Sequence, residues 1–229
     1  MPDINSDFSQ RVVLHTRDMP WISSPIAGVD RRMLDRLGDE TARATSIVRY
    51  APDSHFSPHV HHGGEEFVVL EGVFEDEHGS YPSGTYIRNP PTSRHTPGST
   101  AGCIIFVKLW QFDPDDRTHI QLNIEASLNV TDLVQNRLLL MHLYQDSFEF
   151  VRVERWQPDT HVDIDCSGGA EILVLNGGLT ESEDQLSQHA WCRLPDGYKF
   201  IGNSGEQGCT LWIKSGHLIH ARRPDVNQA

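Results

Sequence analysis

The 229-residue sequence predicts an all-β fold in which two halves repeat one order of strands. Short runs rich in Val, Ile, Phe, Leu and Tyr are separated roughly every ten residues by Gly, Pro, Asn, Asp and Ser, a rhythm typical of sandwiches and barrels. Long stretches of helical periodicity are missing. The repeat is the second observation, because matching segments recur in the same order along the chain.

The internal similarity covers three pairs of segments. Residues 51–72 resemble residues 157–177, with one residue fewer in the second copy, and "YIRNPPTSRH" matches "WCRLPDGYKF". "GCIIFVK" matches "GCTLWIK" further along. These matches place the two copies at about residues 45–112 and 137–215. The predicted domains are an N-terminal arm over 1–44, a first domain over 45–118 and a second domain over 119–229.

The elements follow in chain order. Residues 30–40, "DRRMLDRLGDE", are the best candidate for a helix, and an extended arm explains them equally well. The arm could add edge strands or cover a sheet face. "EEFVVLEGVFED", "GTYIRNP" and "GCIIFVKLWQF" are the clearest strands. Residues 113–132 are expected to connect the copies, with a strand at "HIQLNI".

Charge and cysteine usage exclude several classes of protein. The formal net charge of -13 argues against nucleic acid or an anionic membrane as partner, because both bind through Lys and Arg. No secretory leader or long apolar span is recognisable, so a cytoplasmic protein is expected. The four cysteines form no CxxC pair and are expected to be buried free thiols, rather than disulfides or a cysteine zinc site.

A cluster of histidines and a glutamate precedes the first clear strand. His59 and His61 are two residues apart, so on a strand both side chains share a face. Gly63 and Gly64 allow a tight turn, after which Glu65 opens the next strand. His95 arrives from a different strand. Three imidazoles and a carboxylate make a site for a borderline divalent ion such as Zn, Fe, Mn, Ni or Cu.

This arrangement resembles the cupin superfamily. Its first motif, G(x)5HxH(x)3,4E(x)6G, is matched by the ligand candidates and Gly72, with Asp53 in place of the leading glycine. Its second motif, G(x)5PxG(x)2H(x)3N, is matched by Gly84, Pro90 and His95. Thr92 and Ser99 replace the remaining glycine and asparagine. The resemblance implies two tandem RmlC-like jelly-roll barrels, the second degenerate.

A narrower resemblance is to the cupin domain of ChrR-type anti-sigma factors and related ketone and diketone dioxygenases. It implies one metal ion per chain, zinc first, with Fe, Mn or Ni as alternatives, held by His59, His61, Glu65 and His95. Sigma-factor binding is not expected, because no cysteine precedes Cys103 and the N-terminal helical zinc module with its His-x3-Cys-x2-Cys pattern is absent. The resemblance also implies self-association, with a homodimer as one outcome.

The second copy lacks the ligand set. Cys166 stands opposite His61, Ala170 opposite Glu65 and Phe200 opposite His95, while His59 falls near Asp163 or Ile164. One thiol cannot make a site, so apolar bulk such as Phe200 is expected where the first copy holds its ion.

Other polar residues are weighed against plain structural roles. Glu66 is expected to point outward or to support a ligand, and His62 to be exposed. Tyr86, Arg88 and Lys108 could serve the cavity, but Arg88 and Lys108 recur as Arg193 and Lys214, which favours a structural role. His217 and His220 are expected in a solvated tail. The residues treated as ordinary surface or core histidines are His55, His78, His119 and His142.

Three functions remain open from the sequence. The first is a metal-binding bicupin that senses a small molecule or an oxidative signal in transcription control. The second is a non-haem Fe(II) dioxygenase that cleaves β-diketones or aryl ketones. The third is a structural bicupin whose metal stabilises the barrel. No general base or nucleophile triad is recognisable, so catalytic residues and the small-molecule ligand are not assigned.

Overall fold

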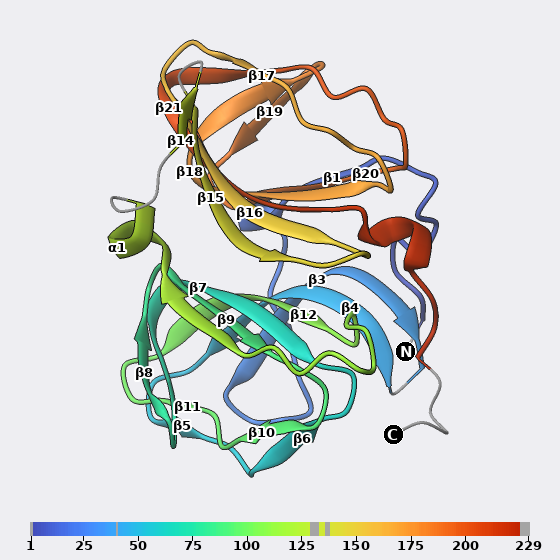
Figure 1. Ribbon diagram of the computed structural model, residues 1–229. Helices are drawn as coiled ribbons and strands as arrows, with labels where there is room; N and C mark the ends of the chain where they lie inside the picture. The colour runs from blue at the N-terminus through green and yellow to red at the C-terminus, as the bar shows by residue number, and fades with distance from the viewer. Residues whose placement is uncertain (1, 40, 129–132, 136–137, 225–229) are drawn as a thin grey trace. The chain divides into compact units, whose positions relative to one another are not determined.

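The computed structural model describes residues 2–39, 41–128, 133–135 and 138–224. It is an all-β protein whose chain forms two compact units (Figure 1). Unit 1 comprises Met1–Ser6, Pro20–Glu125 and Arg222–Ala229, and unit 2 comprises Asp7–Met19 and Ala126–Ala221. Residues 129–132 of the predicted connection, and residue 40 of the candidate helix, lie outside the described residues.

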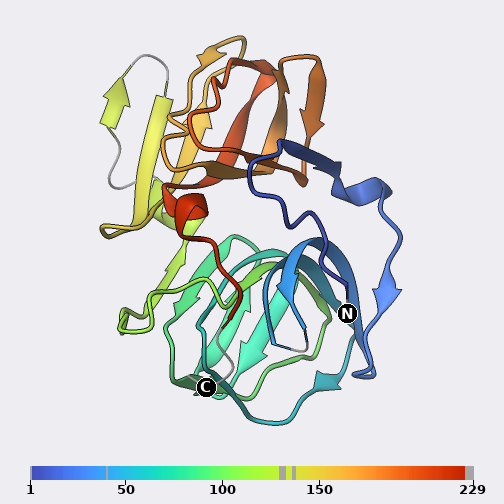
Figure 2. The ribbon, with the colours of Figure 1, turned by 90° about the vertical axis from the view of Figure 1, so that its right-hand side faces the viewer.

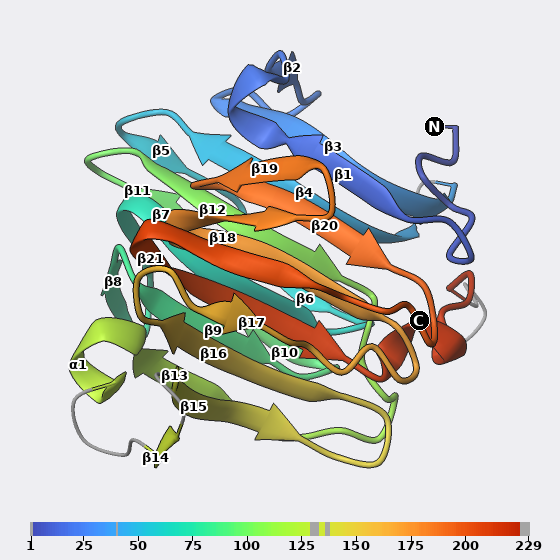
Figure 3. The ribbon, with the colours of Figure 1, turned by 90° about the horizontal axis from the view of Figure 1, so that it is seen from above.

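Unit 1 holds a ten-stranded sheet and a two-stranded sheet. The main order is β13-β9-β7-β12-β4-β3-β2, which can be followed in Figure 3, while β5, β8 and β11 pair beside it and β6 pairs β10. The strands are β2 (Ile22–Ser23), β3 (Val29–Gly38), β4 (Ala42–Tyr50), β5 (Ser54–His55), β6 (His59–His61), β7 (Glu65–Asp76), β8 (Gly79–Pro82), β9 (Thr85–Asn89), β10 (Ser93–His95), β11 (Gly98–Ser99), β12 (Cys103–Leu109) and β13 (Ile120–Asn123).

Unit 2 holds a nine-stranded sheet with the order β1-β20-β18-β21-β16-β15-β14, beside which β17 pairs β21 and β19 pairs β18. The strands are β1 (Val12–His15), β14 (Leu133–Gln135), β15 (Leu138–Gln145), β16 (Phe150–Trp156), β17 (His161–Val162), β18 (Ala170–Glu181), β19 (Asp184–Ser187), β20 (Ala190–Leu194) and β21 (Gly202–Ser215). The helical segments of the chain are η1 (Thr16–Asp18), α1 (Ile124–Leu128) and η2 (His217–His220). None of the helices in the described residues has the length and apolar character of a membrane span.

The predicted strands are confirmed, and the repeat appears as matched elements. β7 and β18 are both twelve residues long, and the predicted strand at "HIQLNI" is β13. Gly72 and Gly177 have φ of 73° and 70°, and a Cβ on either would lie 2.1 Å from the carbonyl oxygen of Gly102 or Gly208. Only glycine fits so close an approach of two backbones, so both copies keep the same kink.

The N-terminal arm adds edge strands, which was one of its two expected roles. β1 pairs with β20 in unit 2, where Figure 2 shows it in dark blue beside the orange strands. The segment considered for a helix is strand β3, paired along its length with β4. Its Met, Leu and Arg residues favour a helix locally, but pairing with β4 satisfies the backbone of a strand and outweighs that weak preference.

Each unit has its own apolar core. The core of unit 1 contains Phe67, Phe74 and Ile105 with their apolar neighbours, and the core of unit 2 contains Ile172, Leu211 and Phe200. All four cysteines are buried and free, as expected.

The ten-stranded sheet of unit 1 carries a buried ionic cluster on the face away from the core. Glu66 is 1% exposed and accepts hydrogen bonds from Tyr86 and Arg88, and Arg88 also pairs with Asp116 at 2.7 Å. The structural role expected for Arg88 is thus confirmed. Glu66 faces away from the core, as predicted, and it is buried in this ionic cluster.

The prediction of a solvated tail around "GHLIHARR" is wrong for His217. This residue is buried, and its Nε2 lies 2.9 Å from Oε1 of Glu171. Sequence position near the end of the chain did not reveal that η2 packs back onto β18. His220 is exposed.

Candidate metal centre

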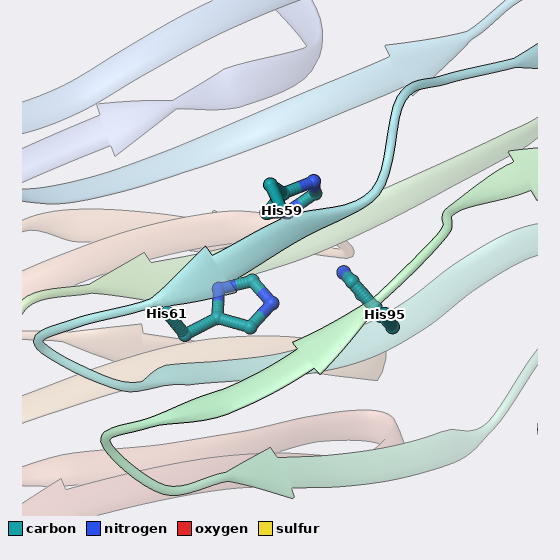
Figure 4. A group of neighbouring side chains, drawn as sticks. All are labelled: His59, His61 and His95. Carbon is teal, nitrogen blue, oxygen red and sulfur yellow. The ribbon is translucent and has the colours of Figure 1, made fainter.

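The histidines of the predicted site come from two short paired strands. His59 and His61 lie on β6, and His95 lies on β10, directly opposite His59 in an antiparallel register. One residue separates His59 from His61, so the pleat turns both rings to the same side. The ring centroids are 4.7–4.9 Å apart in all three pairs, and the three rings, which Figure 4 shows close together, meet edge to face.

A turn that contains Gly63 and Gly64 joins β6 to β7 and brings Glu65 close to the rings of His61 and His95. Gly64 has φ of 75°, and a Cβ on Gly63 would lie 2.2 Å from the ring of Trp110. The turn therefore needs both glycines, one for its backbone angle and one for its packing. His62, within the turn, is exposed as predicted.

The four predicted ligands converge. One nitrogen from each histidine lies within 4.8 Å of the others, and Glu65 Oε2 lies 3.4 Å from His61 Nε2 and 3.7 Å from His95 Nε2. The sequence-based selection of these four side chains thus agrees with where the fold brings them, while their binding of an ion stays a prediction.

The donor atoms fit a divalent cation. His61 Nε2 is buried and makes no hydrogen bond with any described residue. A buried polar nitrogen without a partner is costly, and a lone pair aimed at a cation would remove that cost. Three nitrogens and one carboxylate oxygen form a donor set that suits zinc and other borderline first-row ions.

The pKa values follow from burial and from neighbouring charge. Burial, with the nearby histidines, lowers the pKa of His61 to about 3, so its imidazole is neutral near pH 7. Burial raises the pKa of Glu65, against the opposing effects of His95 and of Asn89, whose Nδ2 donates to Glu65 Oε2 at 3.3 Å. A neutral imidazole is the form that binds a metal ion.

Asp76 is a functional residue that the sequence analysis missed. Its Oδ2 lies 3.3 Å from His95 Nδ1, the nitrogen on the far side of the ring from Glu65. Burial lowers the pKa of His95, but the bond to Asp76 and the charge of Glu65 outweigh it, so the pKa is raised overall. A carboxylate on Nδ1 fixes the tautomer and leaves Nε2 free to bind an ion.

Tyr81 and two backbone amides hold Asp76 in place. The Tyr81 hydroxyl donates to Asp76 Oδ1 at 2.9 Å, and the amides of His78 and Gly79 donate to the same oxygen. The only signal for Asp76 in the sequence is its place at the end of the long strand β7, and many acidic residues near turns look alike.

The cluster borders a cavity of about 630 Å³ inside unit 1. His59, His61 and Glu65 line one part of it, β4 and β12 contribute mainly apolar side chains, and β3 contributes both apolar and charged ones. His59 is exposed, so an ion at the cluster would be reachable from solvent. The apolar residues on the cavity wall include Val29, Met33, Val48, Phe56, Ile105, Val107 and Leu109.

The corresponding region of unit 2 is apolar. Cys166, Ala170 and Phe200 are each at most 2% exposed and belong to one apolar core, together with Ile164. Burial raises the pKa of Cys166 to about 12, so its thiol is protonated at neutral pH. These side chains are packed as a core rather than arranged as ligands.

Comparisons with known proteins agree with this geometry. Residues 9–113 match the family model of the ChrR cupin-like domain. A comparison with curated proteins finds no match.

Solved structures with the same fold cover most of the chain. A proposed dioxygenase from Nostoc punctiforme has a TM-score of 0.73 at 14% identity, covering 93% of this chain and 85% of its own. The Escherichia coli pirin YhhW, solved with nickel(II), has a TM-score of 0.62 at 15% identity, covering 91% and 100%. Salicylate 1,2-dioxygenase from Pseudaminobacter salicylatoxidans has a TM-score of 0.61 at 11% identity, covering 77% and 71%. At such low identity these likenesses show the fold alone.

The domain match and the histidine cluster thus agree: residues 9–113 of the chain are similar to the ChrR cupin-like domain.

Proposed function

We propose that this protein is a metal-binding bicupin that holds one divalent cation through His59, His61, Glu65 and His95. The observation that carries the proposal is the convergence of three imidazole nitrogens within 4.8 Å around a buried carboxylate. Zinc is the first candidate, and Fe, Mn or Ni would accept the same donors. The second unit is proposed to be a degenerate cupin barrel in which Phe200 and Cys166 occupy the space of the former metal site.

The proposed role is a small-molecule or oxidative-signal sensing module in transcription control. Two observations support it: the match to the ChrR cupin-like domain, and a cavity of about 630 Å³ that adjoins the ligand cluster. This volume lies within the range of pockets that enclose drug-sized molecules.

Enzyme activity is the alternative, as a non-haem Fe(II) dioxygenase acting on β-diketones or aryl ketones. It is favoured by the exposure of His59 at the cluster and by the likeness in fold to a proposed dioxygenase and to salicylate 1,2-dioxygenase. Four protein ligands leave about two positions on an octahedral ion. A bound Fe(II) would supply redox chemistry and polarise a substrate oxygen.

The residues of the chain would have separate tasks in either role. Asp76 orients His95, Asn89 holds Glu65 by a hydrogen bond, and the apolar walls from β4 and β12 keep water from the bound molecule. Tyr50, which lines the cavity, has a pKa raised mainly by burial, so its hydroxyl stays a hydrogen-bond donor at neutral pH.

Metal analysis of the purified protein tests the site. We expect about one equivalent of a divalent ion in the wild type, a large loss in His95→Ala, and an unchanged content in His62→Ala and Cys166→Ala. His62 is a matched control because it is an exposed histidine beside His61. Equal metal content in all four proteins would contradict the assignment.

An oxygen-uptake assay separates the two roles. Fe(II)-loaded protein would be mixed with acetylacetone or 2-hydroxyacetophenone in an oxygen electrode. Uptake that is lost in His95→Ala would establish the enzyme. Full occupancy by zinc, with no uptake after loading with Fe(II), would favour the sensing module.

A further inference from the structure

The cavity beside the ligand cluster contains a cationic side chain, Arg31, that pairs with none of the described residues. Three charged groups from β3 line it: Arg31, Asp35 and Arg36. Asp35 pairs with Arg43 at 3.6 Å, and Arg36 donates to the backbone carbonyl of Asp39. Among the described residues, Arg31 makes no hydrogen bond and no ion pair.

Arg31 is set on the cavity wall by strand register. It lies opposite Val48 of β4, Val48 lies opposite Ile105 of β12, and Ile105 lies opposite Val69 of β7. Directly opposed residues on neighbouring strands share a face, so this row points into the unit. A second row of opposed residues runs across the same four strands, from Glu65 on β7 through Leu109 and Ala44 to Arg36 on β3. The row that contains Arg31 therefore lies four residues along β7, β12 and β4 from the row that contains Glu65.

The wall between Arg31 and the histidines is mostly apolar, and the hydroxyl groups of Ser46 and Tyr50 are polar members of the lining. Val48, Ile105 and Val107 form the wall, and Phe56 stacks against Tyr50 with ring centroids 5.0 Å apart. The Tyr50 hydroxyl makes no hydrogen bond with the described residues, and both Glu65 and Arg31 act on its charge state.

Arg31 is partly buried, and a guanidinium on the wall of a largely apolar cavity is suited to one kind of ligand. Arg binds a carboxylate with two parallel hydrogen bonds, and a low-dielectric wall strengthens that pair. A neutral molecule would leave the guanidinium without a counter-charge. A highly charged molecule would lose hydration against the valines and leucines.

We infer that the cavity binds a small monocarboxylate with an apolar aryl or alkyl body, its carboxylate on Arg31 and its body directed toward the metal end. This inference deepens the proposed function, because it names the class of molecule that would reach the cation. It adds Arg31 as the residue that determines specificity for an acid over a neutral molecule.

Isothermal titration calorimetry with two matched pairs of probes tests the inference. The pairs are 3-phenylpropanoate with 3-phenylpropanamide, and hexanoate with hexanamide, since acid and amide differ in charge but hardly in size. We expect at least one acid to bind the wild type roughly tenfold or more tightly than its amide. Arg31→Gln should remove this preference, and Arg31→Lys should keep part of it.

Arg49→Gln is the matched control. Arg49 lies on β4, carries the same charge, pairs with Asp30 and has a 43% exposed side chain outside the cavity. It should keep the preference of the wild type. If no probe binds, if acid and amide bind equally, or if Arg31→Gln keeps the preference, the inference is overturned. The wild-type comparison decides the question even if Arg31→Gln does not fold.

Metal content measured on the same samples separates the two proposals. Arg31→Gln should keep the metal of the wild type, because Arg31 is not a ligand. Metal without a preference for acids defeats the carboxylate inference alone. A preference that depends on Arg31 in a protein that binds no metal defeats the metal assignment alone.

Discussion

Replacing Asp76 with Asn should weaken metal binding without removing any ligand. In the wild type, Asp76 Oδ2 lies 3.3 Å from His95 Nδ1 and only accepts hydrogen bonds. An Asn that keeps its oxygen toward Tyr81 and the two amides would present its NH₂ group to His95. Two donors would then meet, so the ring would favour the tautomer with its proton on Nε2, the nitrogen that faces Glu65.

The magnitude follows from the role of the carboxylate. Loss of a carboxylate that orients a histidine ligand typically costs 10- to 100-fold in metal affinity, about 1.4–2.7 kcal/mol. Asp76 is buried at 6% side-chain exposure, so water cannot easily replace it. We therefore expect a weakening toward the upper part of that range.

Competition with a chromophoric chelator for Zn²⁺ measures this affinity. Glu71→Gln is the control, because Glu71 is an exposed acid on the same strand and loses the same charge. Tyr81→Phe should have a smaller effect, since it removes one of three hydrogen bonds to Asp76 Oδ1. Wild-type affinity in a folded Asp76→Asn protein would refute the reasoning.

Three further predictions concern stability and reactivity. Gly72→Ala should lower the free energy of unfolding by roughly 2 kcal/mol or more in denaturant melts, because the φ of residue 72 is 73° and a Cβ there would lie 2.1 Å from a carbonyl oxygen. Gly79→Ala is the control and should change this free energy little, since a Cβ at residue 79 would have its nearest contact at 3.7 Å. Arg88→Met should lower the free energy of unfolding by about 3–5 kcal/mol, because it leaves the buried carboxylates of Glu66 and Asp116 without their cation. Arg49→Met should lower it by about 1 kcal/mol or less, because that ion pair is partly exposed, and similar losses in both variants would contradict this difference. Iodoacetamide at pH 8 should leave the native thiols unmodified, since the thiols are buried and burial raises the pKa of Cys103 to about 11. The free energy of unfolding should fall as pH rises from about 9 through 11, because the thiol of Cys103 loses its proton at lower pH in the unfolded chain than in the folded one.

Much of the fold and of the candidate metal centre was determined by local sequence patterns. The strands β7, β9 and β12 were predicted because alternating or continuous apolar runs end at turn residues. His59, His61 and Glu65 were identifiable together because strand pleat and one glycine turn, both local features, bring them to one side. His95 needed the spacing of the second motif as well.

Other features were decided only by tertiary structure, because they depend on residues far apart in the chain. β1 pairs with β20, about 180 residues later, and no local pattern selects that partner. Asp76 reaches His95 only once β7 and β10 are folded together, and the burial of His217 depends on Glu171. Arg31 looked like one basic residue among several in a segment read as helix or arm. Its position as the unpaired cation of the cavity follows from strand register across four strands, which short-range patterns do not encode.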